Sequence, residues 1–243
     1  MPHHARGSIL LARYLALAWL GLVIYGSLHP FSGWRDTGIS PLAFLEGGWP
    51  RYWTVFDLAA NVTVYLPLGF FFTLALSSLP WRFTGLILAV ILAGATSFSL
   101  ETIQTWLPSR VPSNIDLACN TLGGLLGALW AQHVGPRVLT RWAHLEQQLI
   151  APVPHAELGL TLLGLWLLVP LSPETLLFGA GDLRQALGLM GAVPFAAESF
   201  VLIEASITAF NTIAVGLILR WLIAHTRWAY VIVPLFLLLG LAV

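Results

Sequence analysis

Three groups of polar side chains interrupt the apolar runs of this chain, and each group is spaced to share one face of a helix. Side chains three or four residues apart lie on the same side of an α-helix, which turns every 3.6 residues. Carboxylates and amides are costly inside apolar spans, so these groups indicate a site that binds, reacts or holds helices together. The groups are Asp57 with Asn61, Glu101 with Gln104, and Asp116 with Asn120.

The second and third groups are separated by a connection of seven residues, 107–113, with Asn114 as the predicted N-cap of the next helix. Helices joined by so short a turn are antiparallel neighbours, and we therefore expect Glu101 and Asp116 to lie close together. Arg110 in this connection is a candidate counter-ion for either carboxylate. Its guanidinium could also bind a phosphate or carboxylate group of a ligand in a two-pronged geometry.

Glycines extend two of the polar faces. Gly123 and Gly127 continue the face of Asp116, and Gly94 extends the face of Glu101. Small residues four apart let helix backbones approach closely within a membrane. The polar groups therefore have two interpretations: a ligand site, or a hydrogen-bonded staple that fixes helix packing and binds nothing.

The composition excludes an ordinary soluble fold. Of 243 residues, 58% are hydrophobic and 9% are charged, whereas roughly 25% are charged in soluble domains. The chain has no lysine, which excludes Schiff-base chemistry and a Walker-type phosphate loop. The single cysteine, Cys119, can build neither a disulfide framework nor a thiolate metal site, and no basic tract indicates nucleic acid as a partner.

Long apolar runs predict an all-α fold, a polytopic transmembrane helix bundle of about six to seven spans. The runs cover about 9–28, 57–79, 83–106, 115–134, 157–171, 198–224 and 228–243. Glycines and prolines predict a loop over 29–56, and an amphipathic pattern predicts an interfacial helix over 135–154. The last run ends without a polar flank, which indicates a chain cut within a span.

Arginines predict the orientation of the bundle. Seven of them flank one side of the predicted spans and four flank the other, and positive residues are in excess on the cytoplasmic side. The amino terminus is therefore expected to be cytoplasmic. With this orientation, all three polar groups lie near the outer surface.

Three segments resemble the VanZ-like family of bacterial membrane proteins: FDLAANVTVYLPLGF, LETIQ and SRVPSNIDLACNTLGGLLG. The resemblance implies a four-helix membrane domain over 1–135, which leaves a cytoplasmic interfacial connector at 136–156 and additional transmembrane helices at 157–243. The family pattern falls on Asp57, Asn61, Pro67, Gly69, Glu101, Gln104, Arg110, Asp116, Asn120 and Gly123. Many relatives have extra acidic residues where this chain has Ser113 and Ile115, so we expect neither a multi-carboxylate metal site nor a cofactor.

The resemblance also implies a function class. The family is named for a protein associated with low-level teicoplanin resistance, and no established reaction carries over from it. We expect a multi-pass protein of the bacterial inner membrane, in contact with membrane lipids. Its outer cleft is expected to engage a lipid-linked envelope precursor or a glycopeptide-like head group, with a role in teicoplanin-type resistance.

Two other functions stay open. A membrane-embedded hydrolase or transferase would use Glu101 or Asp116 as a general base, although no nucleophile motif is present. A proton-coupled transporter would need carboxylates near the midplane, where only Glu204 is expected. Glu204 shares a helix face with Thr208 and Asn211, which we interpret as packing groups, while Glu198 lies on another face of the same span.

Overall fold

The fold is all-helical, as predicted. The computed structural model describes residues 3–50, 52–168 and 197–241, in which no strand forms beyond one isolated bridge between Ile150 and Ile223. The helices are α1 His3–Leu28, α2 Ala43–Glu46, α3 Val55–Ala75, α4 Arg82–Gln104, α5 Asn114–Leu149, α6 Ala156–Leu168, α8 Ala197–Leu222 and α9 Thr226–Leu241.

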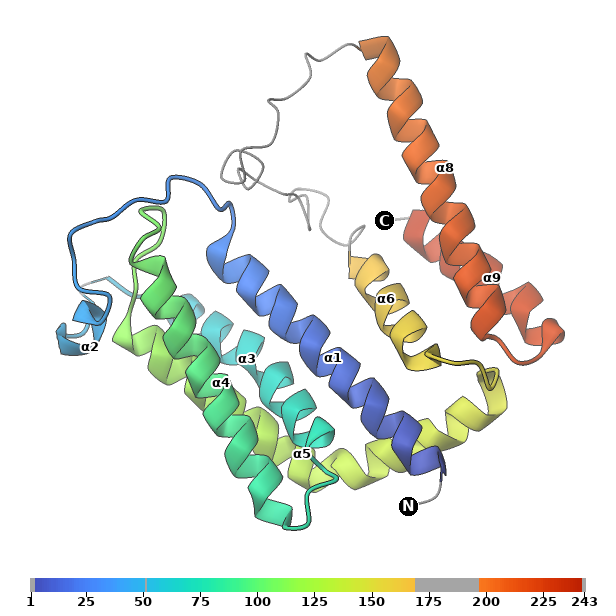
Figure 1. The fold of residues 1–243 in the computed structure, drawn as a ribbon, viewed down its shortest axis with the longest axis horizontal. Helices are drawn as coiled ribbons and strands as arrows, with labels where there is room; N and C mark the ends of the chain where they lie inside the picture. The colour runs from blue at the N-terminus through green and yellow to red at the C-terminus, as the bar shows by residue number, and fades with distance from the viewer. Residues whose placement is uncertain (1–2, 51, 169–196, 242–243) are drawn as a thin grey trace. The chain divides into compact units, whose positions relative to one another are not determined.

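The described residues divide into two compact units, 3–140 and 141–168 with 197–241. In the first unit, α1, α3, α4 and the greater part of α5 lie alongside one another, and the short helix α2 lies in the loop after α1 (Figure 1). Its core combines Leu68 with the small residues Ala89, Ala93 and Ala128, all fully buried. Small side chains at the centre allow the helices to pack closely.

Glycines bring α3 and α5 into backbone contact. A Cβ atom on Gly123 would collide with the carbonyl oxygen of Val62, and one on Gly127 would collide with the carbonyl oxygen of Leu66. No larger residue fits at either position unless the two helices separate. The glycine face of α5 is therefore the face that α3 covers.

Gly94 of α4 packs less tightly. A Cβ atom there would lie 3.4 Å from Oγ1 of Thr121, which is close to ordinary van der Waals contact. The collisions at Gly123 and Gly127 have no counterpart at this glycine, so a side chain is tolerated better at Gly94 than at either of them.

Helix α5 continues past the predicted end of its span. The predicted break at 134–135 does not occur, and one helix runs from Asn114 to Leu149 with Pro136 inside it. Pro136 cannot donate a hydrogen bond to the carbonyl of Gln132, and its ring crowds the preceding turn, but the helix continues through it. At 1.5 Å per residue, the 36 residues of α5 extend about 54 Å, which exceeds the roughly 30 Å of a hydrocarbon core. One helix therefore includes both the predicted span and the predicted interfacial segment.

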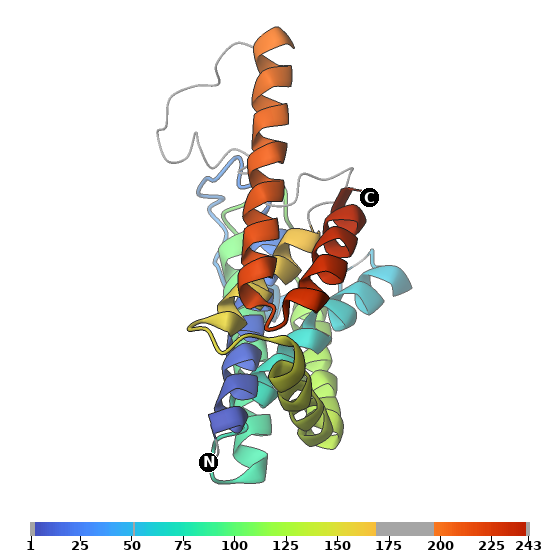
Figure 2. The same cartoon turned by 90° about the vertical axis from the view of Figure 1, so that its right-hand side faces the viewer.

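The second unit consists of the end of α5 with α6, α8 and α9, and α8 and α9 form a helical hairpin in Figure 2. The backbone N–H of Ala151 donates to the carbonyl of Leu222 at 2.7 Å, and that of Ala224 donates to Leu149 at 2.9 Å. Leu163 of α6 and Leu222 of α8 are buried in its apolar core. These bonds join the segment after α5 to the turn between α8 and α9.

Four helices in the described part of the chain are long and apolar enough to cross a membrane: α1, α3, α4 and α8. Helices α6 and α9 are apolar but shorter, and α6 is described only to Leu168 of the predicted span 157–171. Helix α5 is not among the four, because polar residues lower its mean hydropathy. The count of six to seven membrane spans and the cytoplasmic position of the amino terminus remain predictions.

We expect Gly127→Ala to destabilise the first unit by about 1–3 kcal/mol, because the added methyl group overpacks the contact between α3 and α5. Gly21→Ala in α1 is the matched control, since nothing lies within 4 Å of a Cβ atom there and alanine favours a helix over glycine by up to about 1 kcal/mol. Thermal unfolding in detergent measures both variants. Equal unfolding midpoints would contradict the backbone contact.

Candidate functional site

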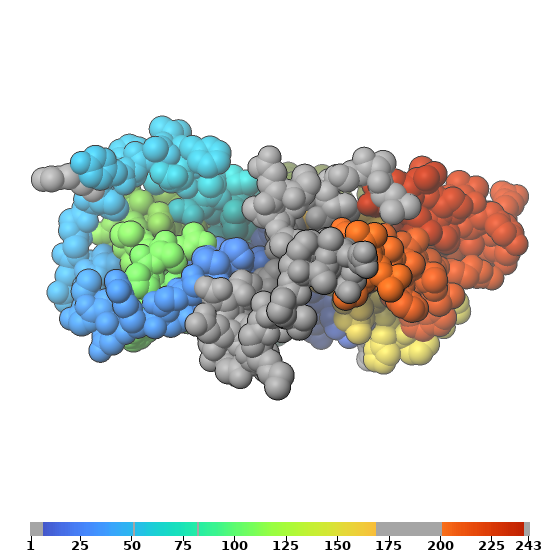
Figure 3. Space-filling view, turned by 90° about the horizontal axis from the view of Figure 1, so that it is seen from above, coloured from blue at the N-terminus to red at the C-terminus, as the bar shows by residue number. Residues whose placement is uncertain are grey.

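The three polar groups lie at one end of the first unit. Asp57 is in the first turn of α3, Glu101 in the last turn of α4, and Asp116 in the first turn of α5. Figure 3 looks onto this end, where the segment after α1 (blue), the start of α3 (cyan) and the connection between α4 and α5 (green) lie next to one another. Residues far apart in sequence therefore meet at the ends of three helices.

Asn61 and Asp116 join α3 to α5 directly. The side-chain amide of Asn61 donates to Oδ1 of Asp116 at 2.7 Å, and both side chains are partly buried. This contact connects two of the three predicted polar groups.

Asp57 has a local partner instead. Its Oδ2 accepts hydrogen bonds from the backbone N–H and the hydroxyl of Thr54, at 2.9 and 2.8 Å, while Oγ1 of Thr54 accepts from the backbone N–H of Asp57. This reciprocal capping box starts α3. The carboxylate of Asp57 is exposed, and it is close enough to Asp116 for the two negative charges to repel each other.

Glu101 holds the start of α5. Only 4% of this residue is exposed, and its Oε2 accepts the backbone N–H of Ser113 at 2.8 Å. Oγ of Ser113 accepts from the backbone N–H groups of Ile115 and Asp116. Ser113 therefore caps α5, and the prediction of Asn114 as N-cap is wrong, because Asn114 is already helical and donates to the carbonyl of Gly47 at 2.9 Å.

Asn120 lies deeper in the bundle. Its amide donates to Oγ of Ser97 at 2.9 Å, and Ser97 is also hydrogen-bonded to Tyr65. Oδ1 of Asn120 is buried and accepts no hydrogen bond from the described residues. Hydrogen-bonded polar side chains therefore extend inward from the helix ends and connect α3, α4 and α5.

Arg110 and Gln104 cap the carboxyl end of α1. The Nη2 group of Arg110 donates to the carbonyls of Gly26 and His29 at 2.9 and 2.8 Å, and the amide of Gln104 donates to the carbonyl of Ser27 at 3.0 Å. The last carbonyls of a helix have no partner within it, and a cation there also offsets the negative end of the helix dipole.

The prediction of Arg110 as counter-ion is wrong. No ion pair connects its guanidinium to Glu101 or Asp116, because the guanidinium is turned towards the end of α1. The two carboxylates are instead held by uncharged donors, Asn61 and the backbone of Ser113.

A hollow of about 320 Å³ adjoins this end of the unit. The carboxylates of Asp57 and Asp116 both line it, whereas Glu101, Asn120 and Arg110 do not. The remaining wall comes from the loop before α3 and from the connection between α4 and α5, and includes Phe44, Gly47, Tyr52, Trp53, Val111, Pro112 and Asn114. Because an ionised carboxylate only accepts hydrogen bonds, this hollow suits a ligand that brings hydroxyl or amine donors.

Sequence reasoning missed the aromatic wall and the role of Ser113. Phe44, Tyr52 and Trp53 lie in a segment whose glycines and prolines predict only a loop. A serine immediately before the helical pattern is a recognised N-cap signal, so Ser113 could have been found. Nothing in the spacing of the aromatic residues indicates that they line a hollow with Asp116.

The VanZ/LLP1 family matches residues 13–135, about half of the chain. The chain belongs to this family. The matched region contains all three polar groups, the glycine face of α5 and the aromatic wall, so the site described above lies entirely within the VanZ/LLP1 part of the protein. Together with the apolar helices, the match identifies a VanZ-like membrane protein.

No curated protein and no solved structure matches the chain.

A further polar group of the sequence pattern, around Glu204, lies outside the VanZ/LLP1 region. Glu204, Thr208 and Asn211 lie on α8 in the second unit and are exposed there, and the side chain of Glu198 lies outside the described part. Among the described residues, no three His, Cys, Asp or Glu side chains gather closely enough to hold a metal ion.

We expect Asn61 and Asp116 to be energetically coupled. In a double-mutant cycle with Asn61→Ala and Asp116→Ala, the coupling energy should be about 0.6–1.7 kcal/mol, the range for hydrogen bonds between helices in a membrane. Thermal or denaturant unfolding of the four proteins in detergent gives this value.

The control cycle pairs Asn61→Ala with Gln104→Ala, which removes a bond to α1 that does not involve Asn61. Those two changes are expected to be additive within about 0.3–0.5 kcal/mol. Additivity in the first cycle as well would contradict the contact between Asn61 and Asp116.

Proposed function

We propose that this VanZ-like membrane protein binds a head group rich in hydroxyl and amine groups in the hollow between the loop before α3 and the start of α5. A lipid-linked envelope precursor and a glycopeptide both carry such groups. The single observation that supports the proposal is the pair of carboxylates, Asp57 and Asp116, in the wall of one hollow with three aromatic side chains.

The composition of the hollow supports this ligand chemistry. Hydroxyl and ammonium groups donate hydrogen bonds to carboxylates, and bonds to a charged acceptor contribute about 1.5–3 kcal/mol each. An ammonium group also interacts favourably with the face of a tryptophan or tyrosine ring. The two carboxylates therefore favour the sugar or amine part of a ligand over any phosphate that the ligand carries.

The polar residues outside the hollow are assigned to positioning. Glu101, Gln104, Asn120 and Arg110 contact helix ends or neighbouring helices rather than the hollow. A hydrolase or transferase with Glu101 as general base gains no support from this geometry, because Glu101 is buried behind Ser113. We therefore favour a binding function over an enzymatic one.

We expect Asp116→Asn to weaken ligand binding at least tenfold, which corresponds to about 1.4 kcal/mol. The purified protein in detergent is titrated with teicoplanin and with a lipid-linked disaccharide precursor, and binding is followed by native mass spectrometry. In cells, the wild-type protein is expected to raise teicoplanin tolerance and Asp116→Asn to abolish the gain.

Asp36→Asn is the matched control, since it removes one carboxylate from the preceding loop and Asp36 does not line the hollow. Among the described residues, Asp36 accepts a hydrogen bond from the backbone N–H of Gly38 alone. Its affinity should equal that of the wild type. If Asp116→Asn binds as tightly as Asp36→Asn, or if neither probe binds the wild-type protein, the proposed function is wrong.

We further propose that the protein is a multi-pass protein of the bacterial inner membrane with a cytoplasmic amino terminus and the hollow on the outer side. The arginine asymmetry supports this orientation. Ser109 and Ser78 lie in exposed turns at opposite ends of α4, so they test opposite sides of the membrane.

In a Cys119→Ser background, a cysteine in place of Ser109 is expected to react with an impermeant thiol reagent added to intact spheroplasts, and one in place of Ser78 to react only after lysis. The cysteine-free protein controls for background labelling. The reverse pattern would place the hollow on the cytoplasmic side.

A further inference from the structure

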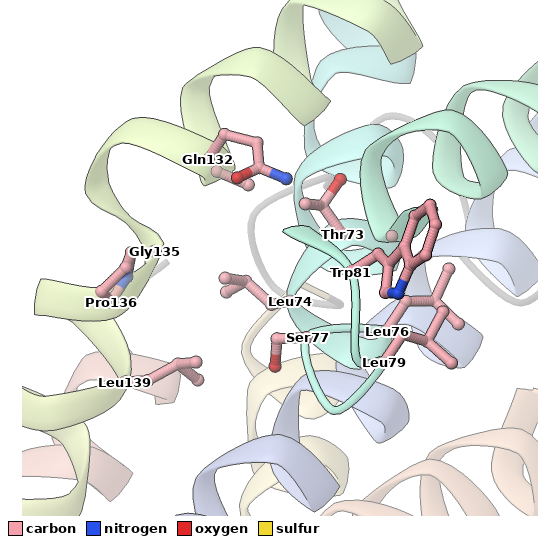
Figure 4. Close-up of a pocket in the computed structure, with 12 residues that line it drawn as sticks. Thr73, Leu74, Leu76, Ser77, Leu79, Trp81, Gln132, Gly135, Pro136 and Leu139 are labelled. Atoms are coloured by element: carbon pink, nitrogen blue, oxygen red, sulfur yellow. The ribbon is translucent and has the colours of Figure 1, made fainter. Parts of the chain in front are cut away.

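A second hollow lies at the other end of the first unit, away from the carboxylates. It has a volume of about 240 Å³ and lies between the end of α3, the turn that follows it, and the middle of α5. Figure 4 shows Leu74 and Trp81 on one side of it and Gln132, Pro136 and Leu139 on the other. Nothing in the proposed head-group site uses this hollow.

The sequence of α5 explains why the helix leaves space there. Pro136 has no N–H to donate to the carbonyl of Gln132, and its ring pushes against the preceding turn, which bends a helix. Immediately before it, a Cβ atom on Gly135 would lie 2.7 Å from Cδ2 of Leu74. Contact between α3 and α5 is therefore close at Gly135, and the hollow opens beside this contact.

The depth of the hollow corresponds to a membrane interface. Gly135 lies 21 residues after Asn114, which is about 32 Å along a helix and close to the roughly 30 Å thickness of the hydrocarbon core. Trp81 in the wall is 77% exposed, and tryptophans gather where apolar chains meet polar head groups. The two hollows are therefore about one hydrocarbon thickness apart.

The wall is mainly apolar and one basic side chain lies beside it. Leucine is the most frequent residue of the lining, and no acidic side chain is among the described residues that line it. Arg13 of α1 reaches the end of α3 beside the hollow, where Nε donates to the carbonyl of Ala75 at 3.3 Å and Nη2 to Oγ of Ser78 at 3.4 Å. A guanidinium has five donors, so Arg13 retains free ones.

The size of the hollow limits what can occupy it. Pockets that enclose a complete small-molecule ligand measure about 300–1,000 Å³, so this one holds part of a larger molecule. An apolar wall with a basic residue beside it is complementary to an acyl chain attached to an anionic group. At interfacial depth, the molecule with both features is an anionic phospholipid.

We propose that this hollow binds one acyl chain of an anionic phospholipid, whose phosphate is held by Arg13. The lipid fills the space left between α3 and the bend of α5. Its site is distinct from the head-group site in chemistry, because the first hollow is lined by carboxylates and the second has an arginine beside it.

Native mass spectrometry tests this with phosphatidylglycerol and phosphatidylcholine that carry identical acyl chains. The delipidated wild-type protein is expected to retain at least fivefold more phosphatidylglycerol at equal lipid concentration. Leu139→Trp fills the hollow and should abolish this retention. Leu129→Trp is the matched control, since Leu129 is an exposed residue of the same helix outside the hollow, and it should retain lipid as the wild type does.

The variant Arg13→Gln leaves the hollow open and is expected to retain the two lipids equally. It tests the proposal even if Leu139→Trp fails to fold, which the thermal midpoint of that variant reports. The proposal is overturned if the wild-type protein does not prefer phosphatidylglycerol, if Leu139→Trp folds and retains as much of it as Leu129→Trp, or if Arg13→Gln keeps the preference.

Discussion

Backbone contact between α3 and α5 is the constraint on which the first unit depends. Gly123 and Gly127 of α5 touch carbonyl groups of α3, and Gly69 of α3 meets Gly124 of α5 in the same way. Within lipid there is no hydrophobic force between helices, so close packing and interhelical hydrogen bonds must hold them together. The glycine contacts fix the register of the two helices, and this register places Asn61 within 2.7 Å of Asp116.

The helix ends impose a second requirement, because unpaired backbone groups are costly where water is scarce. Gln104 and Arg110 satisfy carbonyls at the end of α1. The loop after α1 does the same for α4, where the backbone N–H of Arg35 and the hydroxyl of Thr37 donate to the carbonyls of Trp106 and Thr105. Much of the polar cluster therefore stabilises helix termini, and only a few of its members face the hollow.

The contacts of the polar cluster differ from residue to residue. Glu101 and Arg110 bind backbone groups of the chain itself, whereas Asp116 both bonds to Asn61 and lines the hollow. Asp116 therefore connects helix packing to the wall of the hollow. The first unit also separates its charges, with carboxylates at one hollow and Arg13 beside the other.

The sequence alone determined the class of protein and the helix faces. A composition with few charges allows only a membrane environment, and the 3.6-residue period of a helix assigns Asp116, Gly123 and Gly127 to one face. The short connection after Glu101 requires its helix to be adjacent to the next one, so the grouping of polar residues at one end was predictable. Helix periodicity, however, does not specify which neighbour covers a given face.

Only the tertiary structure decided the partners. Arg110 meets Gly26, which is 84 residues away in the chain, and Asn61 meets Asp116 across 55 residues. Local spacing predicted that Arg110 pairs with the nearby carboxylates. The unpaired carbonyls at the end of α1 compete for the same N–H donors, and the sequence of α4 and α5 does not indicate that α1 ends beside Arg110. The continuation of α5 through Pro136 was decided in the same way. Gly135 packs against Leu74 of α3, and the carbonyl of Leu149 at the far end of α5 accepts from Ala224 in the turn after α8. These contacts outweigh the local preference of a glycine and proline pair to end a helix.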